Sequence, residues 1–271
     1  MPELPEVETT RRGIEPHLLG RRIRAAQVHN AALRWPVAPD LAAALRGQQV
    51  LKVERRAKYL LLRLTRGTLI LHLGMSGNLR VLPQAAVLLR HDHLELQLDS
   101  GQSLRLHDPR RFGSCLYTTA DPLDHPLLRA LAPEPLEAQF DGGYLHAITR
   151  GRRVAIKALL LNGRLVTGVG NIYASEALFR ARVRPGRAAR SLNAAECSKL
   201  AAAIRRVLEA AIRVGGTTLR DYLGADGSPG YFRQRLYVYE RAGQPCRRCR
   251  TPIRRIAQGQ RSTYYCPQCQ Q

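Results

Sequence analysis

Residues 22–118 alternate between apolar and polar side chains in short runs, which is typical of strands with one buried face. Turn residues such as Arg66-Gly67 and Ser100-Gly101 separate the runs. Seven strands are expected, at residues 22–28, 49–55, 59–65, 68–73, 93–99, 103–107 and 112–118. Short strands joined by tight turns favour an antiparallel β-sandwich.

Two stretches outside this region carry a helical pattern. From residue 5 to about residue 19, Val7, Ile14 and Leu18 fall on one face and predict a helix that anchors the N-terminus. A second apolar stripe consists of Leu200, Ile204, Val207, Leu208 and Ala211. Asn193 and Glu196 can form a capping box before it, and Gly215-Gly216 ends it.

Four prolines at positions 122, 126, 133 and 135 interrupt regular structure and indicate a domain boundary. We therefore expect a multi-domain α+β chain. Its predicted parts are an N-terminal antiparallel β-sandwich with flanking helices at residues 1–132, an α-helical domain at 133–235 and a small cysteine-rich domain at 236–271.

The 271-residue chain has a net charge of +22 and a pI near 10.9, which indicates a polyanionic partner, most simply nucleic acid. An acidic membrane surface is the alternative, but no basic amphipathic helix stands out. Neither a leader sequence nor an apolar run of membrane length is evident, so a soluble, cytoplasmic protein is expected.

Lysine is scarce in this arginine-rich chain, where only Lys52, Lys58, Lys157 and Lys199 occur among 43 basic residues. Arginine supplies positive charge but does not lose its proton near neutral pH, whereas lysine can. Lys58 and Lys157 are the favoured candidates for a role that needs lysine.

The chain begins Met1-Pro2-Glu3. Removal of Met1 leaves Pro2 as a secondary amine, and an α-amino group titrates near pH 8, so an uncharged nucleophilic fraction exists at neutral pH. Glu3 lies next to that amine as a possible acid or base. The alternative is an ordinary helix start, in which Pro5 and the acidic residues only favour the first turn.

Cys246-x2-Cys249 is followed, after sixteen residues, by Cys266-x2-Cys269. This spacing is typical of a tetrahedral zinc site carried by a β-hairpin, with disulfides as the alternative in an oxidising compartment. Four cysteine ligands leave no open position, so we expect one structural Zn²⁺. The other two cysteines, Cys115 and Cys197, are expected to be small buried side chains.

The cysteine-rich tail and a glycine turn before it are candidate phosphate-binding regions. Residues 241–271 contain seven arginines and no acids, and Arg261 lies between the two cysteine pairs. Gly168-Val-Gly170-Asn171 predicts a helix start with free amides for a phosphate. It lacks the third glycine of a dinucleotide site, so neither a nucleotide nor a redox cofactor is expected.

Asp108-Pro109-Arg110-Arg111-Phe112-Gly113 predicts a turn that carries a cation and an aromatic side chain. An apolar wedge beside an arginine is one way to extrude a nucleotide, whereas a strand start with Phe112 packed inward is the alternative. The same two possibilities apply to Met75. His91 and His93 are phosphate contacts or satisfied polar groups, and no third ligand supports a catalytic metal there.

Together these stretches resemble the bacterial formamidopyrimidine-DNA glycosylases over essentially the whole chain. The resemblance rests on residues 2–8, 55–60, 72–77, 108–113 and 168–176 and on the terminal four-cysteine segment. It implies a β-sandwich, a helix-two-turn-helix domain and a zinc finger, with double-stranded DNA containing oxidised bases or abasic sites as the partner. The same likeness implies a bacterial, nucleoid-associated protein, and one active site in one asymmetric cleft favours a monomer over a homodimer.

The resemblance also implies a role for each site residue. Pro2 attacks C1′ of the damaged nucleoside and forms a Schiff base, Glu3 assists opening of the sugar, and Lys58 and Arg261 assist strand elimination. The implied void-filling wedge consists of Met75, Arg110 and Phe112. The implied contacts to the DNA backbone are His91, Arg153, Asn171 and Arg261, with Lys157 in a region near DNA. Retention of Met1 would block the covalent step.

Two other functions remain open from the sequence. An enzyme of the endonuclease VIII type would prefer oxidised pyrimidines, but the Leu4-Pro5-Glu6-Val7 opening, the wedge residues and a long segment at 216–239 that can cap a lesion pocket favour the purine enzyme. A non-catalytic zinc-finger protein that binds DNA fits the charge and the cysteines equally well. It would leave Pro2, Glu3 and Lys58 without a role.

Overall fold

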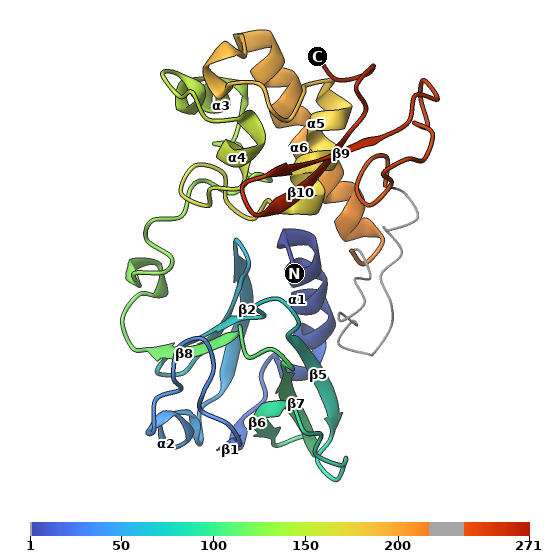
Figure 1. Ribbon diagram of the computed structural model, residues 1–271. Coiled ribbons are helices and arrows are strands. Elements are labelled where there is room, and N and C mark those ends of the chain that lie inside the picture. The colour runs from blue at the N-terminus through green and yellow to red at the C-terminus, as the bar shows by residue number, and fades with distance from the viewer. Residues whose placement is uncertain (1, 217–235) are drawn as a thin grey trace. The chain divides into compact units, whose positions relative to one another are not determined.

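The computed structural model describes residues 2–216 and 236–271 (Figure 1). The described residues form two compact units. The first unit comprises residues 2–129 and 214–216, and the second comprises residues 130–213 and 236–271. The helical region and the cysteine-rich tail thus belong to the same unit.

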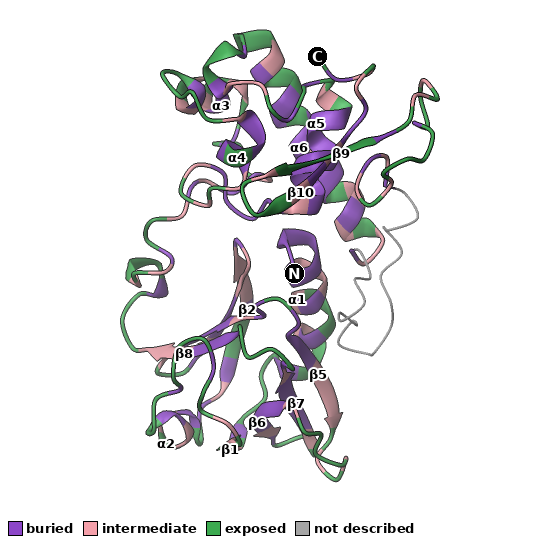
Figure 2. Ribbon diagram, viewed as in Figure 1, coloured by how far each residue is buried: buried purple, intermediate pink, exposed green. Residues whose placement is uncertain are grey.

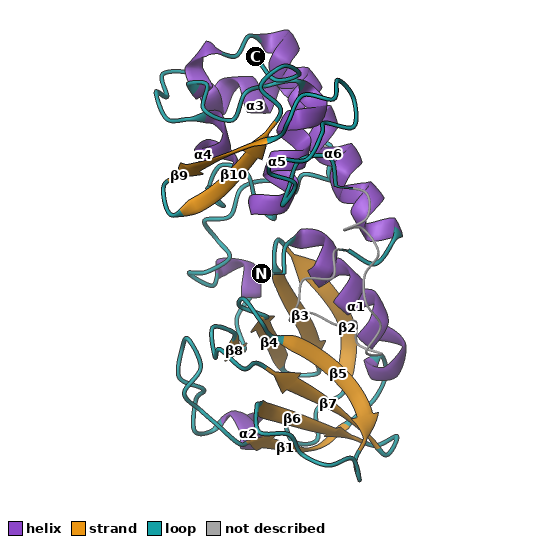
Figure 3. Ribbon diagram, turned by 45° about the vertical axis from the view of Figure 1, so that its right-hand side comes forward, coloured by secondary structure: helices purple, strands orange, loops and turns teal. Residues whose placement is uncertain are grey.

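The described strands of the first unit form two antiparallel four-stranded sheets, as expected for a β-sandwich (Figure 3). One sheet has the order β1-β6-β7-β5 and consists of β1 (Ile23–Val28), β6 (Asp92–Leu98), β7 (Gln102–His107) and β5 (Asn78–Pro83). The other has the order β2-β3-β4-β8 and consists of β2 (Val50–Arg56), β3 (Tyr59–Leu64), β4 (Gly67–His72) and β8 (Ser114–Thr118).

Leucine, valine and isoleucine side chains of both sheets form one buried core. Helix α1 (Leu4–Leu18) adds Val7, Ile14 and Leu18 to this core, each with no exposed surface. Full burial of such a side chain contributes about 1.5–3 kcal/mol, so the predicted apolar face anchors the N-terminal helix firmly. Two short helices, α2 (Leu41–Leu45) and the 3-10 helix η1 (Pro122–Asp124), complete the unit.

The structure differs from the sequence prediction at two strands. Strand β5 was not predicted, because the alternation of Leu79 and Val81 with polar residues is broken by Leu82 and the run ends in Pro83, a residue that edge strands tolerate. Strand β8 begins at Ser114 instead of residue 112. Arg111 adopts a left-handed conformation with φ 58°, which interrupts the extended backbone before the strand.

The second unit is helical and ends in a β-hairpin. Its elements are α3 (Gly142–Thr149), α4 (Ile156–Leu160), α5 (Asn171–Ala181), the 3-10 helix η2 (Ala189–Ser191), α6 (Ala194–Arg213), β9 (Arg254–Gln258) and β10 (Arg261–Tyr265). Helix α5 is almost entirely buried (Figure 2). No helix within the described ranges is both long and apolar enough to span a membrane.

The predicted start of α6 is confirmed in detail. The Asn193 side-chain oxygen accepts from the Glu196 N–H at 2.9 Å, and the Glu196 carboxylate accepts from the Asn193 N–H at 2.9 Å. Each bond satisfies a backbone donor that the helix start would leave unpaired. Gly215 and Gly216, with φ values of 77° and 79°, follow the helix end as predicted.

Candidate functional site

Pro2 lies two residues before α1, whose start is fixed by a reciprocal pair of hydrogen bonds between Glu3 and Glu6. The Glu3 N–H donates to the Glu6 carboxylate at 2.9 Å, and the Glu3 side chain accepts from the Glu6 N–H. Both carboxylate side chains are buried, at 2% and 0% exposure. The helix-start alternative is therefore correct as local structure, and the same capping holds Glu3 in a defined position next to Pro2, which is buried.

Lys58 lies in the two-residue turn between β2 and β3, beside Ala57, whose φ is 55°. Arg55 ties this turn to α1. Its guanidinium contacts the Glu8 carboxylate at 3.2 Å and donates to the Ala57 carbonyl at 3.0 Å. The helix that begins after Glu3 and the turn that carries Lys58 are thus held together by one arginine.

His72, at the end of β4, adjoins the Lys58 turn. Its ring centroid lies 4.8 Å from that of Tyr59. Burial, followed by the positive charges of Lys58 and Arg34, lowers the pKa of His72 to about 4. The neutral ring accepts the Gly74 N–H through Nδ1 at 3.0 Å. The sequence places His72 in the segment 72–77 but does not indicate this role, because the neighbouring cations Lys58 and Arg34 are distant in sequence.

The three predicted wedge residues are exposed. Met75 and Phe112 show 38% and 43% of their surface to solvent. The Arg110 guanidinium carbon lies 4.8 Å from the centre of the Phe112 ring, a cation–π contact. The alternative in which Phe112 packs inward is wrong. Large apolar side chains held at the surface beside a cation suit contact with stacked bases.

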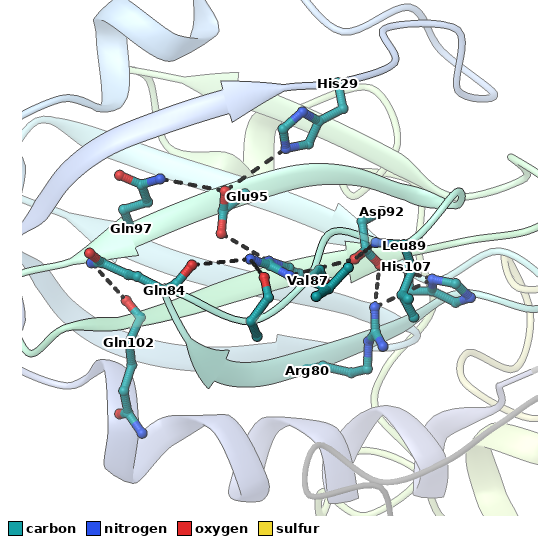
Figure 4. Close-up of polar contacts among 12 residues, drawn as sticks. His29, Arg80, Gln84, Val87, Leu89, Asp92, Glu95, Gln97, Gln102 and His107 are labelled. Carbon is teal, nitrogen blue, oxygen red and sulfur yellow. Dashed lines mark hydrogen bonds and ion pairs between the residues drawn. The ribbon is translucent and has the colours of Figure 1, made fainter.

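Figure 4 shows a network of ion pairs and hydrogen bonds among side chains of β5, β6 and β7 and the segment between β5 and β6. Arg105 pairs with Glu95 at 2.9 Å and donates to the carbonyls of Ala86 and Val87 at 2.8 and 3.0 Å. Asp92, next to His91, accepts from the side chain of His107 at 2.9 Å and also contacts Arg80. Because breaking such buried pairs is costly, the network fixes the backbone on both sides of His91.

In the second unit, two predicted DNA contacts bind the finger hairpin. The Asn171 side-chain amide donates to the Ser262 carbonyl at 3.1 Å, and the Lys157 ammonium donates to the Thr263 hydroxyl at 2.7 Å and to the same carbonyl at 3.2 Å. Lys157 is only 1% exposed. The expectation of a DNA contact at Lys157 is therefore corrected, because its ammonium is buried and bonded to the hairpin.

The two other cationic residues of this unit that the sequence predicts as site residues, Arg153 and Arg261, lie at the surface. Arg153 is exposed in the segment before α4, and Arg261 is exposed at the first position of β10. A two-residue turn, Gly259-Gln260, precedes Arg261. The hairpin expected between the cysteine pairs is thus present, with Arg261 next to its tip.

The four cysteines of the tail come together, with all four Sγ atoms within 4.8 Å of one another. Cys246 and Cys269 are 4.0 Å apart, and Cys249 and Cys266 are 3.4 Å apart. Zinc–sulfur bonds of about 2.3 Å in a tetrahedron require sulfur separations of roughly 3.8 Å, so the residues fit the ion. The N–H groups of Arg248 and Cys269 point to cysteine sulfurs at 3.4 Å.

Glu176 is a structural residue that sequence reasoning did not assign. Its buried carboxylate accepts three backbone N–H groups, from Tyr237, Val238 and Tyr239, at 2.9–3.0 Å. Burial raises the pKa of this carboxyl group. The bonds fasten the chain that enters the finger to α5. The available signal was its position as the single acid among the basic residues 150–190.

A β-sandwich, a helical region and a four-cysteine finger in one basic chain are typical of a zinc-finger protein that binds nucleic acid. Three family models match in this order. They are the formamidopyrimidine-DNA glycosylase N-terminal domain at residues 1–115, the formamidopyrimidine-DNA glycosylase H2TH domain at 131–222, and the zinc finger found in FPG and IleRS at 243–271. The chain belongs to the formamidopyrimidine-DNA glycosylase family.

Individual relatives agree with the family models. Formamidopyrimidine-DNA glycosylase of Thioalkalivibrio sulfidiphilus is 59% identical over 270 residues and covers all of both chains. MutM of Thermus thermophilus is 42% identical, with a TM-score of 0.90, over 99% of this chain and 98% of that one. A Lactococcus lactis FPG mutant bound to Fapy-dG-containing DNA is 33% identical, with a TM-score of 0.93, over 100% of both chains.

These matches confirm the predicted fold, enzyme class and structural zinc. The family consists of bifunctional DNA glycosylases and abasic-site lyases. Other matched structures are MutM bound to DNA with carbocyclic 8-oxo-G and Lactococcus lactis FPG bound to DNA with an oxidised pyrimidine. The sequence predicts that residues 216–239 cap a lesion pocket. Of this segment, positions 217–235 lie outside the described residues.

Proposed function

We propose that this chain removes oxidised purines, 8-oxoguanine and formamidopyrimidines, from double-stranded DNA and then cleaves the damaged strand by β,δ-elimination. The observation that carries the proposal is the full-length match to curated glycosylases, together with the place of Pro2 next to Glu3, the residue that caps α1. Matched structures were solved with Fapy-dG and 8-oxo-G DNA, which supports this substrate class.

The first step is attack of the Pro2 nitrogen on C1′ of the damaged nucleotide. The glycosidic bond breaks, and its electron pair leaves with the base, which takes up a proton. Glu3, next in the chain, donates a proton to O4′ as the sugar ring opens. A secondary amine then yields an iminium that is positively charged at every pH, and this cation draws electrons from the sugar.

Strand cleavage follows from that cation. Loss of the C2′ proton expels the 3′ phosphate, and loss of the C4′ proton expels the 5′ phosphate. Lys58 protonates the first leaving group, a role that arginine cannot fill near neutral pH. Arg261 assists the second elimination from the exposed start of β10. Hydrolysis of the iminium returns Pro2 as the free amine.

Separate groups hold the DNA and extrude the nucleotide. His91, Arg153 and Asn171 bind the sugar-phosphate backbone, while Met75, Arg110 and Phe112 fill the space left by the extruded nucleotide. Cys246, Cys249, Cys266 and Cys269 hold a zinc ion that cross-links the finger. Unstacking a base costs a few kcal/mol, which the wedge and the phosphate contacts offset.

The substrate preference and the setting belong to the same proposal. An enzyme that prefers oxidised pyrimidines is the second candidate, and a related FPG was solved with such DNA. One N-terminal amine per chain is consistent with a monomer. The basic charge and the bacterial relatives support a cytoplasmic protein associated with the chromosome.

Borohydride trapping on a duplex with one 8-oxoguanine opposite cytosine tests the proposal. Reduction of the iminium should cross-link the protein to DNA, and mass spectrometry of the peptide should place the adduct on Pro2 of a chain that lacks Met1. Pro2→Gly should form the cross-link much more slowly, because its primary amine gives an imine that can lose its positive charge. It should retain DNA binding, because the substitution leaves the phosphate contacts intact.

Two outcomes contradict the proposal. Equal binding by the wild type and Pro2→Gly, without a cross-link from either, would indicate a DNA-binding protein that is not an enzyme. A cross-link that forms faster on an oxidised pyrimidine than on 8-oxoguanine would instead assign the endonuclease VIII type of specificity.

A further inference from the structure

The proposed wedge residues come from two loops that are separate in sequence. Met75 lies in residues 73–77, between β4 and β5, and Arg110 and Phe112 lie in residues 108–113, between β7 and β8. Side chains on independent loops enter a base stack as one body only if those loops are fixed to each other. In this structure, the side chain of Asp108 fixes the two loops to each other.

Asp108 is the residue at which the two loops meet. Its side chain has no exposed surface. Oδ1 accepts from the Ser76 hydroxyl at 2.8 Å and from the Arg110 N–H at 3.3 Å, and Oδ2 accepts from the Gly113 N–H at 2.7 Å. One carboxylate thus bonds to the residue after Met75 and to the backbone on both sides of Phe112.

Backbone contact brings the loops closer still. Gly74 has φ +63°, and a Cβ atom there would lie 2.4 Å from the Phe112 carbonyl carbon and 2.5 Å from the Gly113 nitrogen. The Ser76 hydroxyl also accepts from the Arg110 N–H at 3.2 Å. The peptide before Met75 and the peptide after Phe112 therefore touch, and every larger residue at position 74 would separate them.

The backbone of Asp108 also bonds to His91, the residue proposed to contact a phosphate. Its N–H donates to the His91 carbonyl at 2.9 Å. Its carbonyl accepts from His93 Nε2 at 2.8 Å, which resolves the predicted alternatives for His93 in favour of a satisfied polar group. Asp108 thus bonds to both wedge loops and to the residue expected to hold a phosphate.

We propose that Asp108 is a positioning residue for nucleotide extrusion, which holds Met75, Arg110 and Phe112 as one rigid wedge and sets its distance from His91. The inference rests on the proposed function of those residues. A carboxylate is required because each oxygen faces donors. In an asparagine, the side-chain N–H₂ group would face the donors at one of these two oxygen positions. The hydrogen bonds at that position would then be lost.

Single-turnover kinetics on two substrates test this role. Asp108→Asn should slow excision of 8-oxoguanine by roughly 30-fold or more, since small misplacements of positioning groups can cost about 100-fold. Incision at a preformed abasic site should slow at least tenfold less, because no base must be extruded. Asp99→Asn, an exposed aspartate in the turn after β6, is the matched control and should resemble the wild type.

A double-mutant cycle separates positioning from general stability. If Asp108 acts through the wedge, Asp108→Asn should slow excision by a smaller factor when Met75 is already alanine than in the wild type, because coupled residues are non-additive. Ser76→Ala removes one bond to Asp108 without a buried charge change. Ser76→Ala should also slow excision of 8-oxoguanine more than incision at the abasic site, but by smaller factors than Asp108→Asn. It therefore tests the same role if Asp108→Asn fails to fold.

Fluorescence of 2-aminopurine placed opposite an abasic-site analogue reports wedge insertion without chemistry. The wild type should raise the signal, and Asp108→Asn and Ser76→Ala should raise it less. That result with no borohydride cross-link from the wild type would refute the proposed function and leave the positioning role intact. Equal losses on both substrates, additive effects with Met75→Ala, or a wild-type fluorescence signal in both variants would overturn the inference.

Discussion

Lys58 and Lys157 were selected by the same argument, and the structure separates them. Lys58 lies half-buried in a tight turn beside His72, where it perturbs the neighbouring imidazole. Lys157 is buried and its ammonium bonds to Ser262 and Thr263. A buried ammonium must be fully hydrogen-bonded to be tolerated, and its compact head with three donors fits this site. Scarcity of lysine thus marked one candidate for proton transfer and one structural residue.

His72 should make the stability of the first unit depend on pH. Burial and the positive charges of Lys58 and Arg34 lower its pKa to about 4 in the folded protein, against 6.5 ordinarily. Between these values the unfolded chain binds more protons, so the free energy of unfolding falls as the pH falls from 6.5 to 4. The full contribution is roughly 3 kcal/mol.

Urea unfolding of the wild type and His72→Gln at pH 7, 6, 5 and 4 measures this effect. Glutamine retains an acceptor for the Gly74 N–H but does not titrate. The variant should lose less stability than the wild type over this range. Parallel pH profiles for the two proteins would show that His72 titrates normally.

The finger hairpin depends on other parts of its unit more than on its own core. Its buried apolar cluster consists of Phe179, Val238, Ile253, Cys246 and Cys266. A cluster of this size does not fold a domain alone, so the zinc cross-link and the bonds from α4 and α5 to Ser262 must complete it. Glu176 adds a third attachment through three backbone bonds, and removal of one such buried bond costs about 1–3 kcal/mol.

Removal of zinc should therefore release the hairpin and leave the β-sandwich folded. Treatment with a strong chelator should abolish amide-exchange protection at residues 254–265 while β3 and β4 stay protected. Cys266→Ala should behave like the chelated protein. Cys197→Ala, at a buried cysteine outside the cluster, should keep both zinc and protection. Full protection of the hairpin without metal would contradict a structural zinc.

At the scale of the whole molecule, the net charge of +22 sets how the chain meets DNA. Each cation that neutralises a phosphate releases a counterion, so the logarithm of affinity falls linearly with the logarithm of salt concentration, with a slope of about −0.9 per phosphate. Arginine and asparagine contacts to phosphate are therefore distinguishable without a structure of the complex.

Arg153→Gln should weaken binding to an abasic-analogue duplex and make the salt slope shallower by about one. Asn171→Ala should weaken binding with the slope unchanged, because its amide is neutral. Titrations at several salt concentrations measure both. An unchanged slope for Arg153→Gln would remove Arg153 from the phosphate contacts.

Local patterns in the sequence determined much of this protein. The two-residue period specified most of the strands, Asn193 and Glu196 specified the start of α6, and the cysteine spacing specified the zinc site, because each depends on residues that are close along the chain. The motifs then identified the family. Edge strand β5 was missed because its two-residue alternation is interrupted at Leu82 and Pro83.

Contacts between distant segments were decided only by the tertiary structure. The low pKa of His72 follows from its burial and then from the charges of Lys58 and Arg34 beside it, and the burial of Lys157 requires the hairpin. Asp108 bonds to Ser76, 32 residues away, and to His91 through its backbone. A sequence specifies which groups are available, but their charge state, burial and partners follow from what folding places around them.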